Sequence, residues 1–434
     1  MSQVLSPPHL DVDRLIDDRR TRVIVCCGSG GVGKTTTAAA IGLRAAERGR
    51  HVVVLTVDPA RRLAQSMGLS RLDNTPRPVP FAEPEQPGAS RDGRPETGRE
   101  GGRGGGWGHA GGSGGVVPPG QHGDNAGGSL HAMMLDMKRT FDEIVEAHAD
   151  PDRAAQILAN PFYQSLSSGF AGTQEYMAME KLGQLRRADE WDLIVVDTPP
   201  SRSALDFLDA PQRLGRFLDG RLIRLLVVPA KVGGRAYLKV LNAGFGVVTG
   251  VLTRVLGAQV LKDVQTFVSA LDTMFGGFRE RADYTYQLLR APGTAFLVIA
   301  APEPDALREA SYFVERLAQE GMPLAGLILN RVHRSPAARL SAARSLAAAE
   351  TLQAADDQAD AAVSASPNGA PHALTIAALR LHAERMQLSA VERRVSEHFV
   401  AAHPHVPVAE VPAQPDDVHD LAGLRAVGDS FFAG

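Results

Sequence analysis

Short continuous runs of apolar residues recur along the chain, and stretches with helical spacing separate them. Runs of this kind, apolar on both faces, are typical of a parallel sheet that helices cover on both sides and that right-handed crossovers connect. The pattern therefore predicts an α/β fold with a mostly parallel sheet flanked by helices. The predicted strands are Arg22–Cys27, His51–Val57, Leu130–Leu135, Trp191–Val196, Thr294–Ala300, Leu324–Leu329 and His405–Val411.

Helical patterns fill most of the chain between these strands. From Leu205 to about Arg290 the pattern is helical throughout, so we expect an inserted α-helical subdomain over 207–292. The other predicted helices run from just after Lys34 to Arg48, and over Asp136–His148, Thr173–Arg187, Glu303–Glu320, Leu374–Val400 and Asp416–Phe431.

Two segments depart from the pattern. Gly, Pro, Arg and Glu dominate residues 74–129, a composition that cannot bury enough surface to offset its ordering entropy, so a disordered insertion is predicted. Its aromatic residues and arginines are too few for an RNA-binding tail. Residues 335–372 are alanine-rich and predict a helix with a flexible tip. We treat 1–434 as one domain built around the sheet.

Composition narrows the function classes. The chain has 434 residues, of which 44% are hydrophobic and 22% charged, as in globular proteins. A net charge of −3 gives no electrostatic reason to expect nucleic acid as a partner. No apolar signal-peptide core opens the chain, and the most apolar later stretch, Val240–Thr253, is too short to cross a bilayer. We expect a cytoplasmic protein without a transmembrane segment.

The only two cysteines, Cys26 and Cys27, are neighbours within a predicted strand. Neighbouring strand residues face opposite sides of a sheet, so this pair is poorly placed for a disulfide or a metal clamp. We expect both to be small core residues in a reducing compartment.

The segment from Gly28 to Thr35 has P-loop spacing: Gly, four residues, then Gly-Lys-Thr. Glycines let successive backbone N–H groups turn toward one anion, and the following helix adds the positive end of its dipole. Lys34 is expected to reach the outer phosphates, and the Thr35 hydroxyl to hold Mg²⁺. The loop residues expected to bind the nucleotide are Gly28, Ser29, Gly30, Gly31, Val32, Gly33, Lys34, Thr35 and Thr36.

Two aspartates follow predicted strands at the same edge of the sheet. Asp58 comes after His51–Val57, and Asp197 comes after Trp191–Val196. Ligands of open α/β sheets bind at this carboxyl edge. Asp197 has the form of a Walker B acid that holds Mg²⁺, and Asp58 is placed to orient or deprotonate a water. Alone, either is also compatible with a turn or cap aspartate. Thr35, Asp58 and Asp197 form the expected metal site, and Lys34 joins the two aspartates in the expected catalytic set.

Three motifs together resemble the arsenical-pump ATPase family (ArsA) and its relatives that target tail-anchored membrane proteins. The motifs are Gly28–Thr36, Thr56–Ala60 and Asp197–Pro200, and the resemblance covers nearly the whole chain outside 74–129. It implies a P-loop ATPase that uses ATP and Mg²⁺ as a nucleotide-driven dimeric switch. In the targeting proteins, the helical subdomain builds a groove for an apolar client helix.

The resemblance also implies roles for particular residues. Asp58 matches the aspartate of switch I that activates water, and Asp197 matches the aspartate of switch II that senses the γ-phosphate. Asn330 follows the strand Leu324–Leu329 and matches a residue that reads the adenine edge. Pro412 and Ala413 match the second adenine loop.

One position departs from the family pattern. Ser29 stands where the family has a signature lysine that reaches the partner's phosphates across a dimer. Serine cannot supply that charge, which stabilises the transition state of phosphoryl transfer. Either hydrolysis is slow, or a cation such as Arg61, Arg62 or Arg202 substitutes, or a second subunit supplies the lysine. A homodimer and a heterodimer with a lysine-bearing relative both stay open.

Two functions of different classes follow. One is an ATPase switch that handles a membrane-protein client, and the other is a nucleotide-binding scaffold or client-binding subunit with little hydrolysis. The apolar block Tyr237–Phe278 is compatible with a client groove, or with a subdomain that packs on itself or on a dimer partner. Arsenite efflux is disfavoured because the family's arsenite-site cysteines have no counterparts, and the Cys-x-x-Cys zinc clasp of the targeting dimers is missing as well.

Overall fold

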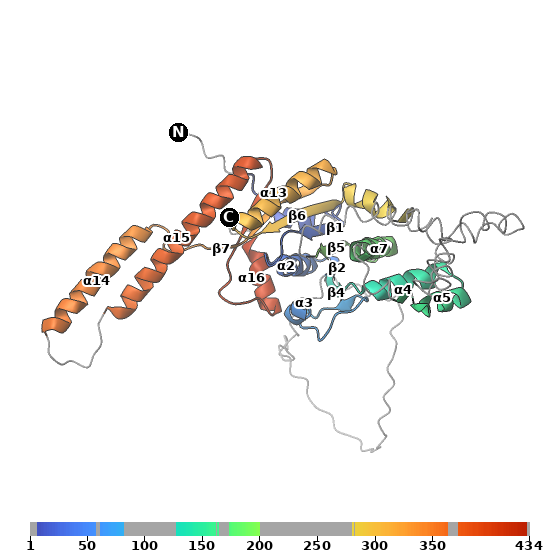
Figure 1. Cartoon of the computed structure of the whole chain (residues 1–434), viewed down its shortest axis with the longest axis horizontal. Coiled ribbons are helices and arrows are strands. Elements are labelled where there is room, and N and C mark those ends of the chain that lie inside the picture. Colours follow the sequence, from blue (N-terminus) through green and yellow to red (C-terminus); the bar gives the residue numbers. More distant parts are fainter. Residues whose placement is uncertain are drawn as a thin grey trace, which may run out of the picture.

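A β-sheet forms the centre of the molecule (Figure 1). It has eight strands in the order β3-β4-β2-β5-β1-β6-β7-β8. The structure is a computed structural model, and it describes residues 7–57, 61–81, 127–161, 163–164, 173–199, 280–281, 283–362 and 372–431. The strands are β1 Val23–Cys27, β2 His51–Thr56, β3 Arg77–Pro78, β4 Ser129–Met134, β5 Leu193–Asp197, β6 Thr294–Ala300, β7 Leu324–Val332 and β8 Val408–Pro412. All neighbouring strands are parallel except β3 and β4, which confirms the predicted α/β fold with a mostly parallel sheet.

The three central strands are buried at every position, as their unbroken apolar sequences require. β1 lies between β5 and β6, with Val25 opposite Val196 on one side and Phe296 on the other. A strand that is apolar on both faces needs a helical layer on each side of the sheet. The sheet therefore brings the carboxyl ends of strands from distant parts of the sequence to one edge.

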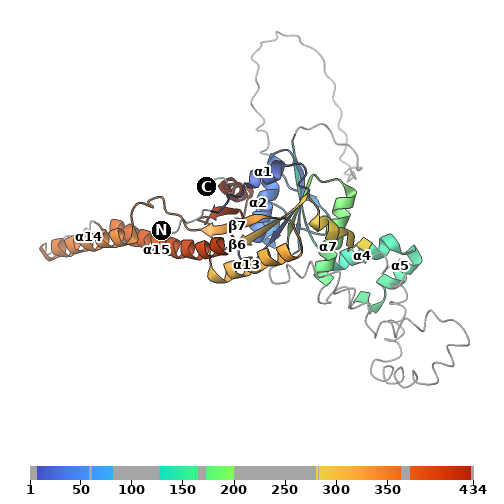
Figure 2. The ribbon, with the colours of Figure 1, turned by 90° about the horizontal axis from the view of Figure 1, so that it is seen from above.

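Helices supply both layers. α2 and α16 pack on each other on one face, while α13 and α15 cover the other face, as the view along the sheet shows (Figure 2). The helices are α1 Val12–Asp17, α2 Lys34–Glu47, α3 Arg61–Ser66, α4 Met137–His148, α5 Pro151–Leu158, α7 Thr173–Ala188, α13 Pro304–Gln319, α14 Ala342–Ala362, α15 Ala373–Ala402 and α16 Leu421–Ser430. None of these described helices combines the length and apolar content that crossing a bilayer requires.

Capping residues set where several helices begin. The Asp136 side chain accepts a hydrogen bond from the backbone of Arg139 at the start of α4. Asp420 accepts one from Gly423 at 2.8 Å, so α16 begins at Leu421. The predicted start of this last helix at Asp416 was therefore wrong. The N-cap residue, which marks the change from non-helical to helical backbone, is Asp420.

Parts of the segments that the sequence set apart belong to the described structure. Within 74–129, Asn74 is buried and β3 pairs with β4, whereas residues 82–126 lie outside the described residues. Of the helical subdomain expected over 207–292, residues 280–281 and 283–290 are helical, and 207–279 lie outside. Within 335–372, residues 342–362 form α14.

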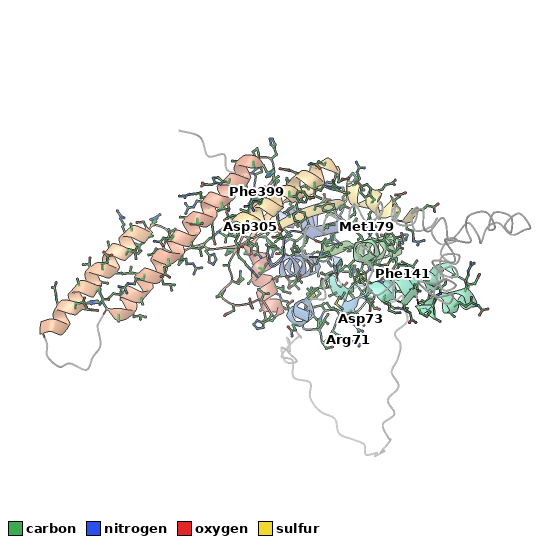
Figure 3. All side chains as sticks on the ribbon, in the orientation of Figure 1. Arg71, Asp73, Phe141, Met179, Asp305 and Phe399 are labelled. Carbon is green, nitrogen blue, oxygen red and sulfur yellow. The ribbon has the colours of Figure 1, made fainter. Side chains whose placement is uncertain are left out.

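α14 and α15 form a helical hairpin that extends away from the sheet in both views (Figures 1 and 2). Ala349 on α14 and Ile376 and Ala383 on α15 are buried between the two helices. Near the tip, the Nδ1 atom of His372 lies 2.6 Å from the Asp356 carboxylate. Where α15 returns to the sheet, Phe399 is buried near α13 (Figure 3).

Candidate functional site

The loop between β1 and α2 packs so tightly against the ends of β6 and β7 that it requires glycine. A Cβ atom on Gly28 would lie 2.1 Å from the Ile299 carbonyl oxygen, and one on Gly33 would lie 2.2 Å from Asn330 Nδ2. Gly33 also has a φ of +91°, a conformation that disfavours a side chain. The loop is thus held by its neighbours with its backbone close to the sheet edge.

Lys34 lies over this loop. Its ammonium group donates a hydrogen bond to the Ser29 carbonyl oxygen at 2.7 Å, and the side chain is largely buried. Lys34 is also the first residue of α2, so its charge lies beside the positive end of the helix dipole. A cation, a helix N-terminus and a glycine-rich loop at one point form a site for an anion such as phosphate.

Asp197, the last residue of β5, is completely buried beside the loop. The Thr35 hydroxyl donates a hydrogen bond to its Oδ2 atom at 2.7 Å, and the Thr56 hydroxyl donates another at 2.9 Å. Hydroxyl and carboxylate oxygens are the ligands that Mg²⁺ prefers. The predicted metal-site residues Thr35 and Asp197 therefore lie in contact, one from α2 and one from β5.

Thr56 is a site residue that the sequence reasoning missed. It is the last residue of β2 and lies opposite Asp197 in the parallel register. Its position just before Val57-Asp58 was the available signal, because a polar residue that ends a buried strand lies at the edge where ligands bind. On the other side of Asp197, the Thr198 hydroxyl donates to the Cys26 carbonyl oxygen at 2.8 Å and fixes the start of the following segment.

Asn330 lies inside β7 and not after it, since the strand continues to Val332 and does not end at Leu329 as predicted. Its Nδ2 atom donates to the Val32 carbonyl oxygen at 2.8 Å, and its Oδ1 atom accepts from the backbone of Arg331. The amide nitrogen carries two hydrogens, so the contact with Val32 leaves one for another acceptor. Asn330 thus braces the glycine loop from the neighbouring strand.

Pro412 and Ala413 lie beside this position. Pro412 is the last residue of β8, where a residue following the strand was predicted, and it pairs with Val332. The backbone of Ala413 donates to the Val332 carbonyl oxygen at 3.0 Å. The sheet therefore brings Asn330, Pro412 and Ala413 to the ends of two neighbouring strands.

Some of the remaining predicted site residues belong to the described structure, and others lie outside it. Gly30 and Gly31 are exposed at the tip of the loop, and Thr36 lies in the first turn of α2. The Ser29 hydroxyl is buried and makes no hydrogen bond with the part of the chain that the structure describes. Asp58 and Arg202 lie outside the described residues, as do the side chains of Arg61 and Arg62 at the start of α3.

Both cysteines are buried in β1, as predicted, and neither forms a disulfide. Burial raises the pKa of Cys27 to about 12, although the charge of Lys34 opposes the shift. Burial, followed by the negative charge of Asp197, raises the pKa of Cys26. The two thiols therefore stay protonated and inaccessible, whereas metal and arsenite capture needs thiolates.

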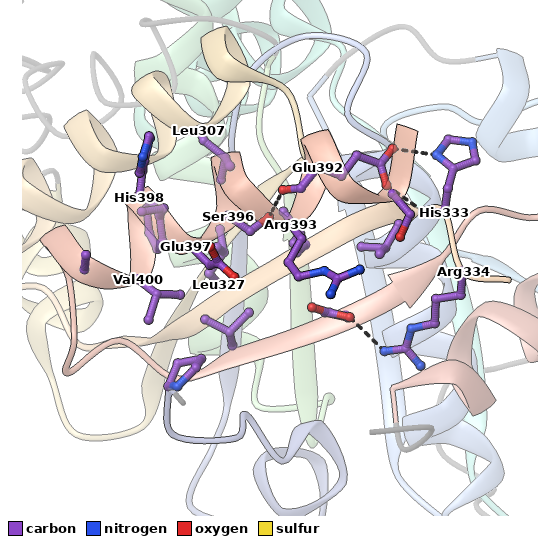
Figure 4. Close-up of a pocket in the computed structure, with 18 of the residues that line it drawn as sticks. Leu307, Leu327, His333, Arg334, Glu392, Arg393, Ser396, Glu397, His398 and Val400 are labelled. Atoms are coloured by element: carbon purple, nitrogen blue, oxygen red, sulfur yellow. Dashed lines mark hydrogen bonds and ion pairs between the residues drawn. The ribbon is translucent and has the colours of Figure 1, made fainter. Parts of the chain in front are cut away.

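A separate cavity of about 810 Å³ lies between α15 and the strands β7 and β8 (Figure 4). Leu307, Leu327 and Val400 are among its apolar lining residues. At one end, His333 contacts the buried carboxylate of Glu392 through both its backbone nitrogen and Nδ1, at 2.9 and 2.6 Å. This double contact fixes α15 to the chain three residues beyond Asn330.

A glycine loop with its lysine, and a threonine–aspartate pair at the carboxyl edge of a parallel sheet, define the class of P-loop nucleotide-binding proteins. The sequence profile of one family in that class, described as anion-transporting ATPase (ArsA), matches residues 21–79 and 126–361. The chain belongs to this family. The matched residues leave out 80–125, most of the glycine-rich insertion.

Known members of the family are similar to this chain at low identity. ATPase GET3 of Malassezia globosa is 26% identical over 212 residues, which cover 49% of this chain and 48% of that protein. ATPase GET3B of Arabidopsis thaliana is 24% identical over 338 residues, 76% of this chain and 70% of that protein. ATPase get3 of Schizosaccharomyces pombe is 20% identical over 325 residues, 75% and 78% of the two chains. The chain thus spans about half the length of the Malassezia relative.

Proposed function

We propose that this protein is an Mg²⁺-dependent ATPase whose nucleotide state switches a dimer. The observation that carries the proposal is the convergence of three groups at the glycine loop: Lys34, the Thr35 hydroxyl and the buried Asp197 carboxylate. A buried carboxylate beside an anion site is costly unless a cation is shared between them. Nucleoside triphosphate with Mg²⁺ supplies both the anion and the cation.

Lys34 and the amides of the glycine loop bind the phosphates and neutralise their charge. In doing so, Lys34 exchanges the Ser29 carbonyl for a phosphate oxygen, which is a stronger, charge-assisted hydrogen bond. Asp58, from the segment after β2, orients the attacking water toward the γ-phosphorus. These are positioning and electrostatic roles, and they account for most catalysis of phosphoryl transfer.

Thr35 and Asp197 are the residues that would hold Mg²⁺, and Asp58 is the third candidate. The metal, when bound, supplies positive charge to the β- and γ-phosphate oxygens. The hydroxyl–carboxylate donor set fits a hard cation, and the two oxygens already lie 2.7 Å apart. Thr56 keeps its hydrogen bond to Oδ2 and so holds the Asp197 carboxylate in one orientation.

Asn330, Pro412 and Ala413 form the adenine side of the site in this proposal. Asn330 retains its bond to Val32 and offers its second amide hydrogen and its carbonyl oxygen to the base edge. Because the same side chain braces the glycine loop, adenine contacts and phosphate contacts are linked through one residue. The cysteines play no part in the proposed function, since their burial argues against arsenite as a transported species.

Ser29 favours a second candidate, a nucleotide-binding subunit with little hydrolysis of its own. Its hydroxyl is buried and neutral where the family places a lysine. In that case the dimer partner is a relative that supplies the lysine, and this chain contributes the helical subdomain expected over 207–292 for handling an apolar membrane-protein segment. The two candidates differ in one measurable property, the rate at which this chain hydrolyses ATP without another protein. The homodimeric ATPase hydrolyses ATP by itself, whereas the lysine-dependent heterodimer needs its partner.

Calorimetry and phosphate release test the proposal together. We expect the protein to bind ATP with Mg²⁺, and Lys34→Met to weaken binding by about tenfold or more because a charge-assisted phosphate contact is lost. Asp197→Asn is expected to remove the Mg²⁺ dependence of binding. Asp58→Asn should retain binding but lose phosphate release. No affinity for adenine nucleotides would overturn the ATPase proposal, and binding without release by the chain alone would favour the second candidate.

A further inference from the structure

Four large apolar side chains of α15 point into solvent on the projecting hairpin. Leu374, Leu381, Leu388 and Val391 are 84%, 66%, 44% and 56% exposed, and we call them the leucine stripe. The three leucines are seven residues apart, which is nearly two helical turns, so they lie on one face. Ile376 and Ala383, which pack on α14, lie on the other side of the helix. α14 therefore does not cover the leucine stripe.

The body of the protein covers the same helix face further along α15, through α13 and through His333 just after β7. Phe399 follows Leu381 by eighteen residues, or five full turns, and so points in the same direction. It is only 4% exposed, and Glu392 on this face is also buried (Figures 3 and 4). One apolar face thus runs along α15, covered by the body of the protein from Glu392 onward and uncovered from Leu374 to Leu388. The described structure supplies no cover for the uncovered part.

The geometry of the uncovered part fits an antiparallel copy of itself. With Leu381 on a two-fold axis, Leu374 lies opposite Leu388 of the partner subunit, and each helix tip ends just before the sheet begins to cover the facing helix. A parallel pairing would instead bring the two sheets into the same space. The uncovered part of α15, from Leu374 to Leu388, is therefore as long as the segment that the same part of an antiparallel copy would cover.

Charges beside the leucine stripe agree with this pairing. Arg380 and Glu384 are exposed on one side of it and make no ion pair within the described part of the chain. In the antiparallel arrangement, Glu384 lies about 3 Å along the axis from Arg380 of the partner subunit, on the same side of the helix pair. Each dimer gains two such ion pairs, because the antiparallel direction places each arginine near the glutamate of the other subunit.

We propose that the leucine stripe is a self-association surface through which two copies of this chain pair antiparallel about Leu381. This surface is separate from the nucleotide site, and its pairing requires no nucleotide. One helix per subunit makes a small interface, so we expect a micromolar dissociation constant. This pairing places the two bodies at opposite ends of the helix pair, so it is distinct from the dimer that nucleotide is proposed to switch.

Sedimentation velocity of the full-length protein without nucleotide tests the proposal. We expect concentration-dependent dimers, and Leu381→Lys should raise the dissociation constant by about 100-fold, because each dimer loses two buried leucines at roughly tenfold each. Ala390→Lys is the matched control, since Ala390 is exposed on the opposite side of the same helix and should leave association unchanged. Far-UV circular dichroism checks that both variants retain their helices.

Two further variants test the register. Glu384→Arg should weaken association by like-charge repulsion, and adding Arg380→Glu should restore it. Leu381→Cys should form an intermolecular disulfide under mild oxidation, whereas Ala390→Cys should not, because it lies on the opposite side of the helix. The two native cysteines are buried and do not compete. A monomer at all concentrations, equal effects at 381 and 390, or no restoration by the charge exchange would overturn the proposal. Binding of the monomer to lipid vesicles through Leu381 would also overturn it, in favour of a membrane surface. None of these substitutions should change ATP binding, because the leucine stripe is separate from the nucleotide site.

Discussion

The hydrogen bond between Thr56 and Asp197 gives the sharpest prediction about the site. Thr56→Val keeps the shape of the side chain and suits a strand, but removes the hydroxyl that donates to Oδ2 at 2.9 Å. Asp197 is fully buried, so water cannot take over the lost bond. A hydrogen bond to a charged group contributes about 1.5–3 kcal/mol, so we expect the free energy of unfolding to fall by about 2 kcal/mol.

Thr37→Val is the matched control. Thr37 is as fully buried as Thr56, but its hydroxyl makes no hydrogen bond within the described residues. Removing an unbonded buried hydroxyl relieves a desolvation cost, so the control should be neutral or stabilising. The comparison therefore separates the bond to Asp197 from the general effect of replacing a buried threonine.

Thermal unfolding followed by circular dichroism, in EDTA and without nucleotide, measures both variants. For a chain of this size, a loss of about 2 kcal/mol corresponds to a drop in the melting temperature of about 2–3 °C for Thr56→Val. Thr37→Val should melt at or above the temperature of the unmodified protein. Equal shifts in the two variants would refute the reasoning, because the effect would then not depend on the carboxylate.

Three other predictions concern the loop and the opposite edge of the sheet. Gly33→Ala should weaken ATP binding measured by calorimetry, because the new Cβ meets Asn330 Nδ2 at 2.2 Å in a left-handed backbone; unchanged affinity would contradict this. Ser29→Lys should raise phosphate release where Ser29→Met, of similar bulk, does not, and equal rates would mean that the missing lysine does not limit turnover. Burial, and then the charge of His51, lowers the pKa of His131 below its usual 6.5. The neutral ring therefore stabilises the fold above that pH, and the contribution is lost as pH falls toward the lowered pKa. We therefore measure the free energy of unfolding by denaturant at several pH values between about 7.5 and 5.5. As the pH falls, His131→Gln should lose less of this free energy than the unmodified protein, and equal losses would exclude the His131 ring as the cause.

The sheet was largely predictable because its strands are unbroken apolar runs that end in polar residues. Thr294–Ala300 has the bounds that its sequence predicts. Arg77–Pro78 gave no signal, since two polar or imino residues form a strand only because β4 presents an edge to them. The end of β7 was missed because Asn330 is polar, yet its backbone continues to pair with β8.

The candidate site was predictable where spacing encodes it and not where packing does. The glycine loop, Thr35 and Asp197 follow from a motif and a strand end, and the structure brings them into contact. The bond from Thr56 to Asp197 depends on the register between β2 and β5, which the two sequences do not specify. The leucine stripe was also hidden, because helical periodicity shows which residues share a face but not whether a neighbour covers that face.

The position of β1 in the sheet bears on how the protein is made. Its neighbours, β5 and β6, begin at Leu193 and Thr294, so the strand that carries the glycine loop waits for the synthesis of about 270 further residues. At roughly 5–20 residues per second, that wait lasts about 15–50 s. During this time an apolar strand with two cysteines leaves the ribosome before either neighbour exists. Nascent chains of this protein should therefore depend on chaperones until β6 emerges, and chains cut short before Thr294 should aggregate.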